Sequence, residues 1–280
     1  MSRARPLEQT RPSGRARGLV SSPESGDRVR VALYEPGAAL ADVACRYWAG
    51  RWDLRGQAPH TTQLLSDPCV NFVFERGRAG IDARVVGVWT RLWRRTLEGE
   101  GLVRGVKLRA GAVRAFVDAS AATLANRIVP LRDVFGDLGD LPARVLDPDD
   151  HAEGFAAFDA WLSARRRTTD ADDVARAIEL VDAVANDPDL TSAAELAERA
   201  DLTPRSLQRL FRDFVGAPPK WVIRRNRLQE VAQRIERGRA PSLAALAAEL
   251  GYADQAHLTR DFKAVVGCTP RAFEARVRDA

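Results

Sequence analysis

The hydrophobic pattern of residues 29–116 is that of short strands. β-Branched and aromatic residues form brief runs between Gly, Pro and Asp, namely VRVALYE, VNFVFERG, ARVVGVW and GLVRGVKLRAGAVRAFV. This enrichment predicts strands, with turns at Asp67-Pro68, Arg76-Gly77 and Gly99-Glu100-Gly101. Several short strands at this spacing predict an antiparallel barrel or sandwich.

Beyond residue 118 the apolar positions recur at i, i+3 and i+4, which predicts helices. The segments 119–138 and 154–167 show this spacing, and the Pro- and Asp-rich stretch 141–150 between them is a predicted loop. From residue 174 onward one helical pattern follows another. The predicted fold class is α+β with two domains, an antiparallel β-barrel or sandwich with flanking helices and an all-α C-terminal domain.

The predicted organisation has four parts. Residues 1–28 are rich in Arg, Pro, Ser and Gly and are expected to be a disordered basic tail. Residues 29–165 form the β domain, residues 166–173 a charged linker, and residues 174–280 the helical domain. A chain of 280 residues is long enough for two separate cores.

Composition limits the compartment and the class of protein. No apolar run approaches the roughly 18 residues of a membrane span, so no membrane partner is expected. Acidic residues interrupt the basic tail and disfavour a transit peptide, and a secretory signal pattern is missing. The cysteines Cys45, Cys69 and Cys268 are odd in number and far apart, which favours a reducing, cytoplasmic location.

One sequence motif is repeated near the C-terminus. The stretch LQRLFRDFVGAPPKW (207–221) and the stretch LTRDFKAVVGCTPRAF (258–273) share Leu, Arg, Phe, Gly and Pro in one order. Phe211 and Phe262 are 51 residues apart, and so are the following Gly and Pro residues. Leu207 and Phe211 lie on one apolar face of a helix.

Each copy is preceded by a short helical pattern with its own cap. Ser192 and Glu195 fit a capping box, Thr203 is a predicted N-cap of the following helix, and Gly216 is its predicted end. In the second copy Ser242 is the predicted cap and Gly251 the turn. A short helix, a turn and a helix with one apolar and one polar face is the helix-turn-helix layout.

The polar faces of the two copies correspond in position but not in identity. Long hydrogen-bonding side chains in the first copy align with partly different residues in the second: Arg205, Gln208, Arg209 and Arg212 with Ala256, Thr259, Arg260 and Lys263. Two helices that recognise different base pairs would show this relation. The alternative is an all-helical bundle with a purely structural repeat.

Charge and length fit a nucleic-acid partner. Residues 191–280 carry 16 basic and 11 acidic residues, and the excess is concentrated between residues 220 and 239. Such a stripe indicates a polyanionic partner or a solvated helix face. The connector of about 19 residues spans about 28 Å as a helix, close to the roughly 34 Å between successive major grooves.

On these motifs the C-terminal part resembles the DNA-binding domain of the AraC/XylS family of transcription regulators. The resemblance implies contacts with double-stranded DNA, and RNA polymerase as a further partner. Base contacts would come from both recognition helices: Arg205, Gln208, Arg209, Gln255, Ala256, Thr259 and Arg260. Phosphate contacts would come from Arg212, Arg224, Arg225 and Lys263, while Ala256 departs from the larger polar residue common at its position.

Residues 31–135 resemble the cupin-like N-terminal domain of certain actinobacterial regulators, through YWAGRWDL, HTTQLLSDPCVNFVFE and VRGVKLRAGAVRAF. The resemblance implies a module that senses a small-molecule effector or forms a homodimer. The predicted pocket is lined by one histidine and five aromatic residues: Trp48, Trp52, His60, Phe72, Phe74 and Trp89. Burial in the core is the alternative for the aromatic residues.

The residues offer no catalytic centre. No nucleophile motif, phosphate-binding loop or dinucleotide fingerprint is present, so we expect no enzyme activity and no cofactor. His60, His151 and His257 are dispersed and form no predicted metal site. The function predicted is sequence-specific DNA binding in transcription. The alternatives are a regulator without ligand and a thiol-dependent DNA alkyl-transfer protein.

Overall fold

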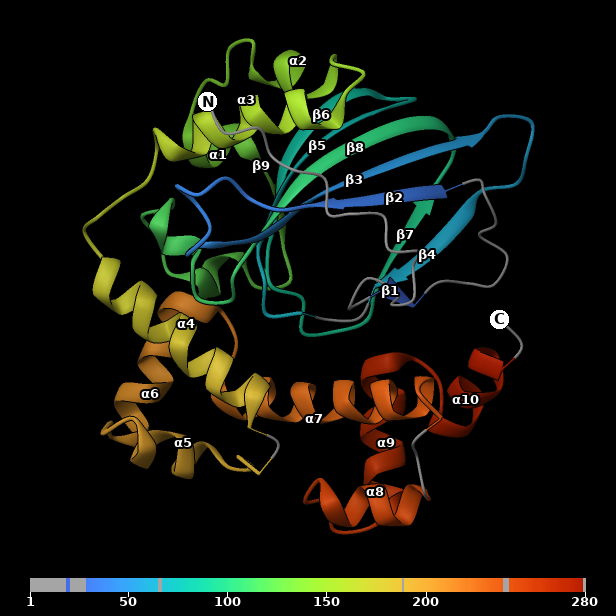
Figure 1. The fold of residues 1–280 in the computed structure, drawn as a ribbon, viewed down its shortest axis with the longest axis vertical. Helices are drawn as coiled ribbons and strands as arrows, with labels where there is room; N and C mark the ends of the chain where they lie inside the picture. Colours follow the sequence, from blue (N-terminus) through green and yellow to red (C-terminus); the bar gives the residue numbers. More distant parts are fainter. Residues whose placement is uncertain (1–18, 21–28, 65–66, 188, 239–241, 279–280) are drawn as a thin grey trace.

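A computed structural model describes residues 19–20, 29–64, 67–187, 189–238 and 242–278. Strands occupy the first half and helices the second (Figure 1). The α+β class with two parts is confirmed. Apart from Leu19–Val20, which form strand β1, the predicted tail lies outside the described residues.

Two antiparallel sheets build the N-terminal half. The larger has six strands in the order β2 (Val29–Tyr34), β3 (Ala44–Leu54), β8 (Gly99–Leu108), β5 (Asn71–Gly77), β6 (Gly80–Val86) and β9 (Ile128–Pro130). The smaller has the order β1, β4 (His60–Leu64) and β7 (Trp93–Leu97). We call the two sheets together the barrel.

The larger sheet has two different faces because successive side chains on a strand point to opposite sides. On β3, Tyr47 belongs to the main core, whereas Trp52 belongs to a separate cluster on the other side. On β5, Phe72 and Phe74 belong to the main core and Val73 to the separate cluster. We call the face with Tyr47 and Phe72 the outer face and the face with Trp52 the inner face.

Three helices cover the outer face: α1 (Leu131–Phe135), α2 (Leu141–Leu146) and α3 (His151–Ser163). Phe158 of α3 packs edge-on against Phe74, with ring centroids 4.9 Å apart. The helix predicted over 119–138 was wrong in extent, because Asn126 has a positive φ of 56° and only residues 131–135 are α-helical. The loop predicted over 141–150 contains α2, since proline is well tolerated in the first turn of a helix.

The C-terminal half is a series of helices: α4 (Ala171–Asn186), α5 (Ala193–Arg199), α6 (Pro204–Leu210), the π-helical turn η4 (Phe211–Val215), α7 (Pro219–Glu236), α8 (Leu243–Glu249), α9 (Gln255–Val266) and α10 (Pro270–Arg278). In Figure 1, α7 runs below the barrel, α8 and α9 lie below α7, and α5 and α6 lie beside the start of α7, next to α4.

The main core does not stop at the predicted linker. It runs without interruption from Phe72 of the barrel through Val181 of α4 to Leu207 of α6 and Val222 of α7. Residues 166–173 are themselves attached to the barrel side, since Arg167 N donates to the carbonyl of Ala115 over 2.8 Å. The second half of α7 forms a separate core with α8, α9 and α10.

Candidate nucleic-acid interface

The first helix-turn-helix unit is built from α5 and α6, and its predicted caps are present. Ser192 Oγ accepts from the N–H of Glu195 over 3.1 Å, and Thr203 Oγ1 accepts from the N–H of Ser206 over 3.1 Å. These bonds satisfy N–H groups that lack a partner within the helix. The helical run ends at Gly216, which has the left-handed φ of 78° that glycine adopts without strain.

The second unit, α8 and α9, repeats this construction with one added residue. Ser242 caps α8 by accepting from Ala245 N over 3.0 Å, and Asp254 caps α9 by accepting from His257 N over 2.6 Å. The capping serines are 50 residues apart, but the caps Thr203 and Asp254 are 51 apart. The turn of the second unit is therefore one residue longer.

The residues predicted to contact bases lie on exposed helix faces, with one exception. Arg205, Gln208 and Arg209 of α6 are exposed, and so are Gln255, Ala256 and Arg260 of α9, whereas Thr259 is half-buried. Within the described part of the chain, no ion pair is recorded for the guanidinium of Arg205, Arg209 or Arg260. Their hydrogen-bond donors are thus available for a ligand such as DNA.

The four residues predicted to contact phosphate fall into two classes. Lys263 and Arg212 are exposed, although Arg212 also pairs with Asp213 of η4 (Nε–Oδ1 2.9 Å). Arg224 of α7, by contrast, donates to Asp261 of α9 over 2.7 Å and thereby connects α7 with α9.

Arg225 faces the barrel, because it lies one turn after Val222, which is part of the core shared with the barrel. Its side chain is 12% exposed, and its Nη2 lies 3.7 Å from Asp67 Oδ2. The geometry therefore gives no support to a phosphate role for Arg225. Sequence reasoning missed this ion pair because residues 67 and 225 are too far apart for any periodicity to connect them.

The segment between β8 and β9 also contacts the first unit directly. Ser120 Oγ donates to Asp213 Oδ1 over 3.0 Å, and the guanidinium of Arg114 lies 4.8 Å from the centre of the Phe214 ring. The Arg212 guanidinium holds the pKa of the Asp213 carboxyl below its usual range, and the bond from Ser120 acts in the same direction. The N-terminal half thus fixes the end of the first recognition helix.

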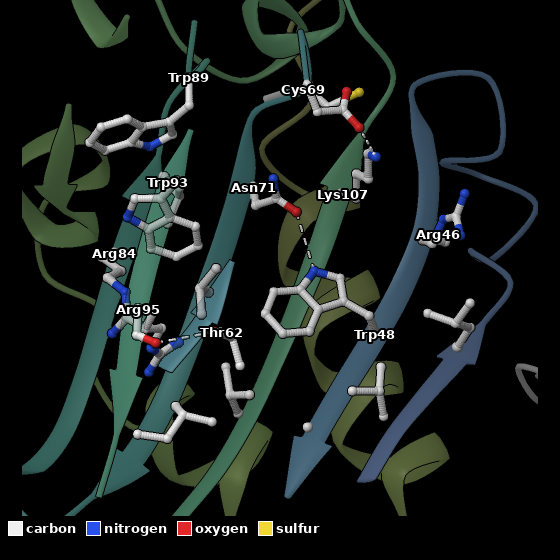
Figure 2. Close-up of a pocket in the computed structure, with 18 of the residues that line it drawn as sticks. Arg46, Trp48, Thr62, Cys69, Asn71, Arg84, Trp89, Trp93, Arg95 and Lys107 are labelled. Carbon is white, nitrogen blue, oxygen red and sulfur yellow. Dashed lines mark hydrogen bonds and ion pairs between the residues drawn. The ribbon is translucent and has the colours of Figure 1, made fainter. Parts of the chain in front are cut away.

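A cavity of about 220 Å³ lies on the inner face of the barrel (Figure 2). Of the residues predicted to line a pocket, Trp48, Trp52 and Trp89 do so. Phe72 and Phe74 instead lie on the outer face, because they alternate with the inner-face residues of β5. His60 of β4 is outside the lining.

Sequence reasoning missed Arg46 and Lys107, which also line this cavity. Arg46 has the same parity along β3 as Trp48 and Trp52, so strand alternation alone could have identified it. A larger cavity of about 750 Å³ adjoins the first between the barrel, α4 and α7.

The comparisons with known proteins follow this division of the chain. A family model described as "Helix-turn-helix domain" matches residues 196–276, and a model described as "Domain of unknown function (DUF6597)" matches residues 32–130. The RCS-specific HTH-type transcriptional activator RclR of Escherichia coli (strain K12) is 36% identical over 83 residues. Residues 196–276 match a helix-turn-helix domain of the AraC type.

Two solved structures are also similar to the chain, at lower identity. A transcriptional regulator with an AraC-type DNA-binding domain from Chromobacterium violaceum has a TM-score of 0.34 and 21% identity, covering 40% of this chain and 96% of that one. ToxT from Vibrio cholerae has a TM-score of 0.44 and 9% identity, covering 89% of this chain and 98% of that one.

The sequence match to RclR covers only part of each protein. It covers 30% of this chain and 29% of RclR, so the chain spans less than a third of the length of this curated relative. In the described ranges no three His, Cys, Asp or Glu side chains are grouped for a metal ion. None of the described helices is long and apolar enough to span a bilayer.

Proposed function

We propose that the protein is a sequence-specific DNA-binding regulator of transcription that places two recognition helices in adjacent major grooves of one duplex. The observation that carries the proposal is the pair of exposed polar faces on α6 and α9, two helices that α7 connects (Figure 1). The 18 residues of α7 span about 27 Å, comparable with the roughly 34 Å between successive major grooves.

The chemistry of these faces fits base recognition. Arginine donates two hydrogen bonds to guanine O6 and N7, and glutamine pairs with adenine N6 and N7 in the major groove. Arg209 and Arg260 are the first candidates for guanine, and Gln208 and Gln255 for adenine. The exposed cations Arg212 and Lys263 would contact phosphates, which position the protein without reading sequence.

The test is a mobility-shift titration of the full chain against fragments selected from genomic DNA. We expect at least one fragment to bind about a thousandfold more tightly than competitor DNA, near the low end of specific recognition. Uniform weak binding to every fragment would overturn the proposal. Footprinting of the selected fragment should then show two protected stretches about one helical turn apart.

The barrel is the proposed regulatory part, acting through a small-molecule effector or a homodimer, and the DNA-bound protein would act on RNA polymerase nearby. A constitutive regulator without ligand is the alternative. Thermal shift of the full chain across metabolite fractions separates the two, since a ligand that binds only the folded state raises its stability.

We infer no catalytic step. A thiol-dependent alkyl transfer needs an activated thiolate, which an electropositive and partly exposed site provides. Burial, assisted by Asp67, instead raises the pKa of Cys69 well above its ordinary value, and burial raises the pKa of Cys268. An unchanged intact mass after exposure to alkylated DNA is the expected result, and a mass increase would contradict it.

A further inference from the structure

The cavity on the inner face of the barrel has the walls of a site for a compact ring system. Four of its lining residues are tryptophans, Trp48, Trp52, Trp89 and Trp93, and Figure 2 shows the indoles of Trp89 and Trp93 next to each other. Their ring centroids are 6.1 Å apart at an interplanar angle of 23°. A dry apolar cavity of about 150 Å³ holds benzene, so about 220 Å³ leaves room for a ring with a short side chain.

The backbone makes room for these indoles. A Cβ on Gly105 of β8 would lie 2.7 Å from the Trp48 ring, and a Cβ on Gly101 would lie 2.1 Å from the Trp52 ring. Trp48 Nε1 donates to Asn71 Oδ1 and Trp52 Nε1 to the carbonyl of Glu98, both over 3.2 Å. These contacts fix two walls of the cavity.

Trp89 differs from Trp48 and Trp52, because its Nε1 is buried and has no hydrogen-bond partner among the described residues. A buried donor without an acceptor costs about 1–3 kcal/mol. A ligand that carries an acceptor atom would satisfy it.

One end of the cavity carries an excess of positive charge. Arg46 of β3 and Lys107 of β8 lie directly opposite each other across the strand pair, and like charges in this position are destabilising. Lys107 pairs with Asp67, but no acidic partner of Arg46 is recorded within the described ranges. Elsewhere in the cavity, Arg84 and Arg95 both pair with Glu75 and Arg84 also pairs with Asp82, so their charges are largely compensated.

Asp67 is the only carboxylate at this end in the described lining, and it pairs with two cations, Lys107 and Arg225. Burial alone would raise the pKa of Asp67, but Lys107 and Arg225 hold it well below its usual range. The site therefore keeps Lys107 charged and has a net attraction for a further anion.

We propose that the inner-face cavity binds a compact ring-bearing organic acid, with the rings among the tryptophans and the acid group between Arg46 and Lys107. This inference rests on the proposed function only in assigning the ligand a regulatory role. A cationic ligand is disfavoured by Arg46 and Lys107.

The same residues connect the cavity to the DNA-binding half. Arg46, Asp67 and Lys107 line both the inner-face cavity and the larger cavity against α7, and Asp67 also pairs with Arg225 of α7. The acid group of the ligand competes with Asp67 for Lys107. Asp67 then interacts mainly with its other partner, Arg225. Ligand binding thereby strengthens the contact between the barrel and the helix that carries both recognition units.

The binding test uses calorimetric titration of the full chain with 3-phenylpropionate and with its neutral analogue 3-phenylpropionamide. We expect the acid to bind at least about tenfold more tightly than the amide. Lys107→Met and Arg46→Gln should each reduce this preference severalfold and leave amide binding unchanged. Arg94→Gln is the control, because Arg94 lies between two inward residues of β7 and is exposed.

Equal binding of acid and amide, failure of both to bind, or an unchanged preference in Arg46→Gln would overturn the assignment. Arg46→Gln carries the test if Lys107→Met does not fold, because Arg46 has no recorded ion pair in the described part of the chain. Gly105→Ala, which pushes the Trp48 ring into the cavity, should weaken both compounds alike. These titrations contain no DNA, so their outcome does not depend on whether the proposed DNA-binding function is correct.

A mobility shift with the selected DNA fragment tests the regulatory step. Saturating 3-phenylpropionate should change the affinity of the wild-type protein for DNA severalfold, and Arg225→Gln should abolish that change while the acid still binds. An effect of equal size in Arg225→Gln would overturn the connection through Asp67 and leave the ligand site standing. Loss of all specific DNA binding by the wild-type protein would instead contradict the proposed function.

Discussion

Arg104 of β8 is buried on the outer face without a carboxylate in ion-pair contact among the described residues. Its guanidinium donates to His151 Nδ1 over 2.9 Å, to the carbonyl of Val145 over 2.5 Å and to the carbonyl of Pro148 over 2.6 Å. Gly154 permits this approach, since a Cβ there would lie 2.4 Å from Arg104 Nη1. One side chain thus holds the end of α2 and the start of α3 on the sheet.

This arrangement predicts a pH dependence of stability. Burial lowers the pKa of His151 below its ordinary value of 6.5, and the charges of Arg104 and Arg51 lower it further. The unfolded chain therefore takes up this proton first as the pH falls. The contribution of His151 to the free energy of unfolding is fully present above pH 6.5 and is lost below it, down to the folded-state pKa.

His151→Asn keeps an acceptor for Arg104 and removes the titration. We expect its free energy of unfolding, measured by urea denaturation, to change less than that of the wild type between about pH 7.5 and about pH 5.5. The same pH response in His151→Asn and the wild type would contradict the assignment.

The exposed polar faces of α6 and α9 allow a prediction about individual arginine residues. Arg209→Ala and Arg260→Ala should each weaken binding to the cognate site by about 1–3 kcal/mol and relax base preference at one position. Arg212→Ala should weaken binding to all sequences alike, because phosphate contacts carry no sequence information. Arg78→Ala removes the same charge from an exposed position of the barrel and should have no effect.

Mobility shifts on single-base variants of the cognate site provide the measurement. If Arg209→Ala, Arg260→Ala and Arg212→Ala change the affinity for these variants in the same way, the assignment of base contacts to Arg209 and Arg260 is wrong.

The structural elements show where sequence patterns sufficed and where they did not. Caps and turns were predictable, because Ser192, Thr203 and Ser242 act on N–H groups three residues away. The two faces of the large sheet were not, because register decides which residues share a face and register depends on pairing with distant strands. Trp48 and Phe72 are both aromatic, yet one lines the cavity and the other belongs to the core.

Gly216 lies at the contact between the first helix-turn-helix unit and the N-terminal half. Its φ is 78°, and a Cβ there would lie 2.9 Å from the carbonyl oxygen of Ala121 in the barrel half. Gly238 after α7 also has a positive φ, of 62°, but apart from its chain neighbours no atom of the described residues lies within 4 Å of its Cβ position. Alanine at either site costs about 1–2 kcal/mol of backbone strain, and only Gly216→Ala adds a steric clash.

Gly216→Ala should therefore lower the free energy of unfolding by about 1–3 kcal/mol more than Gly238→Ala. Chemical denaturation of the two variants measures the difference. Equal losses would show that the contact between Gly216 and the barrel half contributes nothing.

At the scale of the molecule, the two helix-turn-helix units are attached differently. The first shares the main core with the barrel, while the second has its own small core with the end of α7. The linker predicted at 166–173 from composition was misleading in this respect, because the physical division of the cores falls inside α7, between Ile223 and Leu228. A continuous helix hides such a division from any sequence pattern.

This division predicts two cooperative units in native-state hydrogen exchange. Leu196 of α5 and Leu246 of α8 occupy equivalent positions and are almost fully buried, so alanine at either should cost about 2–5 kcal/mol. Leu246→Ala should accelerate exchange in residues 228–278 alone, because their core can open without the rest. Leu196→Ala should accelerate exchange in α4, α6 and the barrel helices together, since these share one core. Exchange measured peptide by peptide distinguishes the cases, and two variants with the same pattern of acceleration would mean that α7 transmits opening across its whole length.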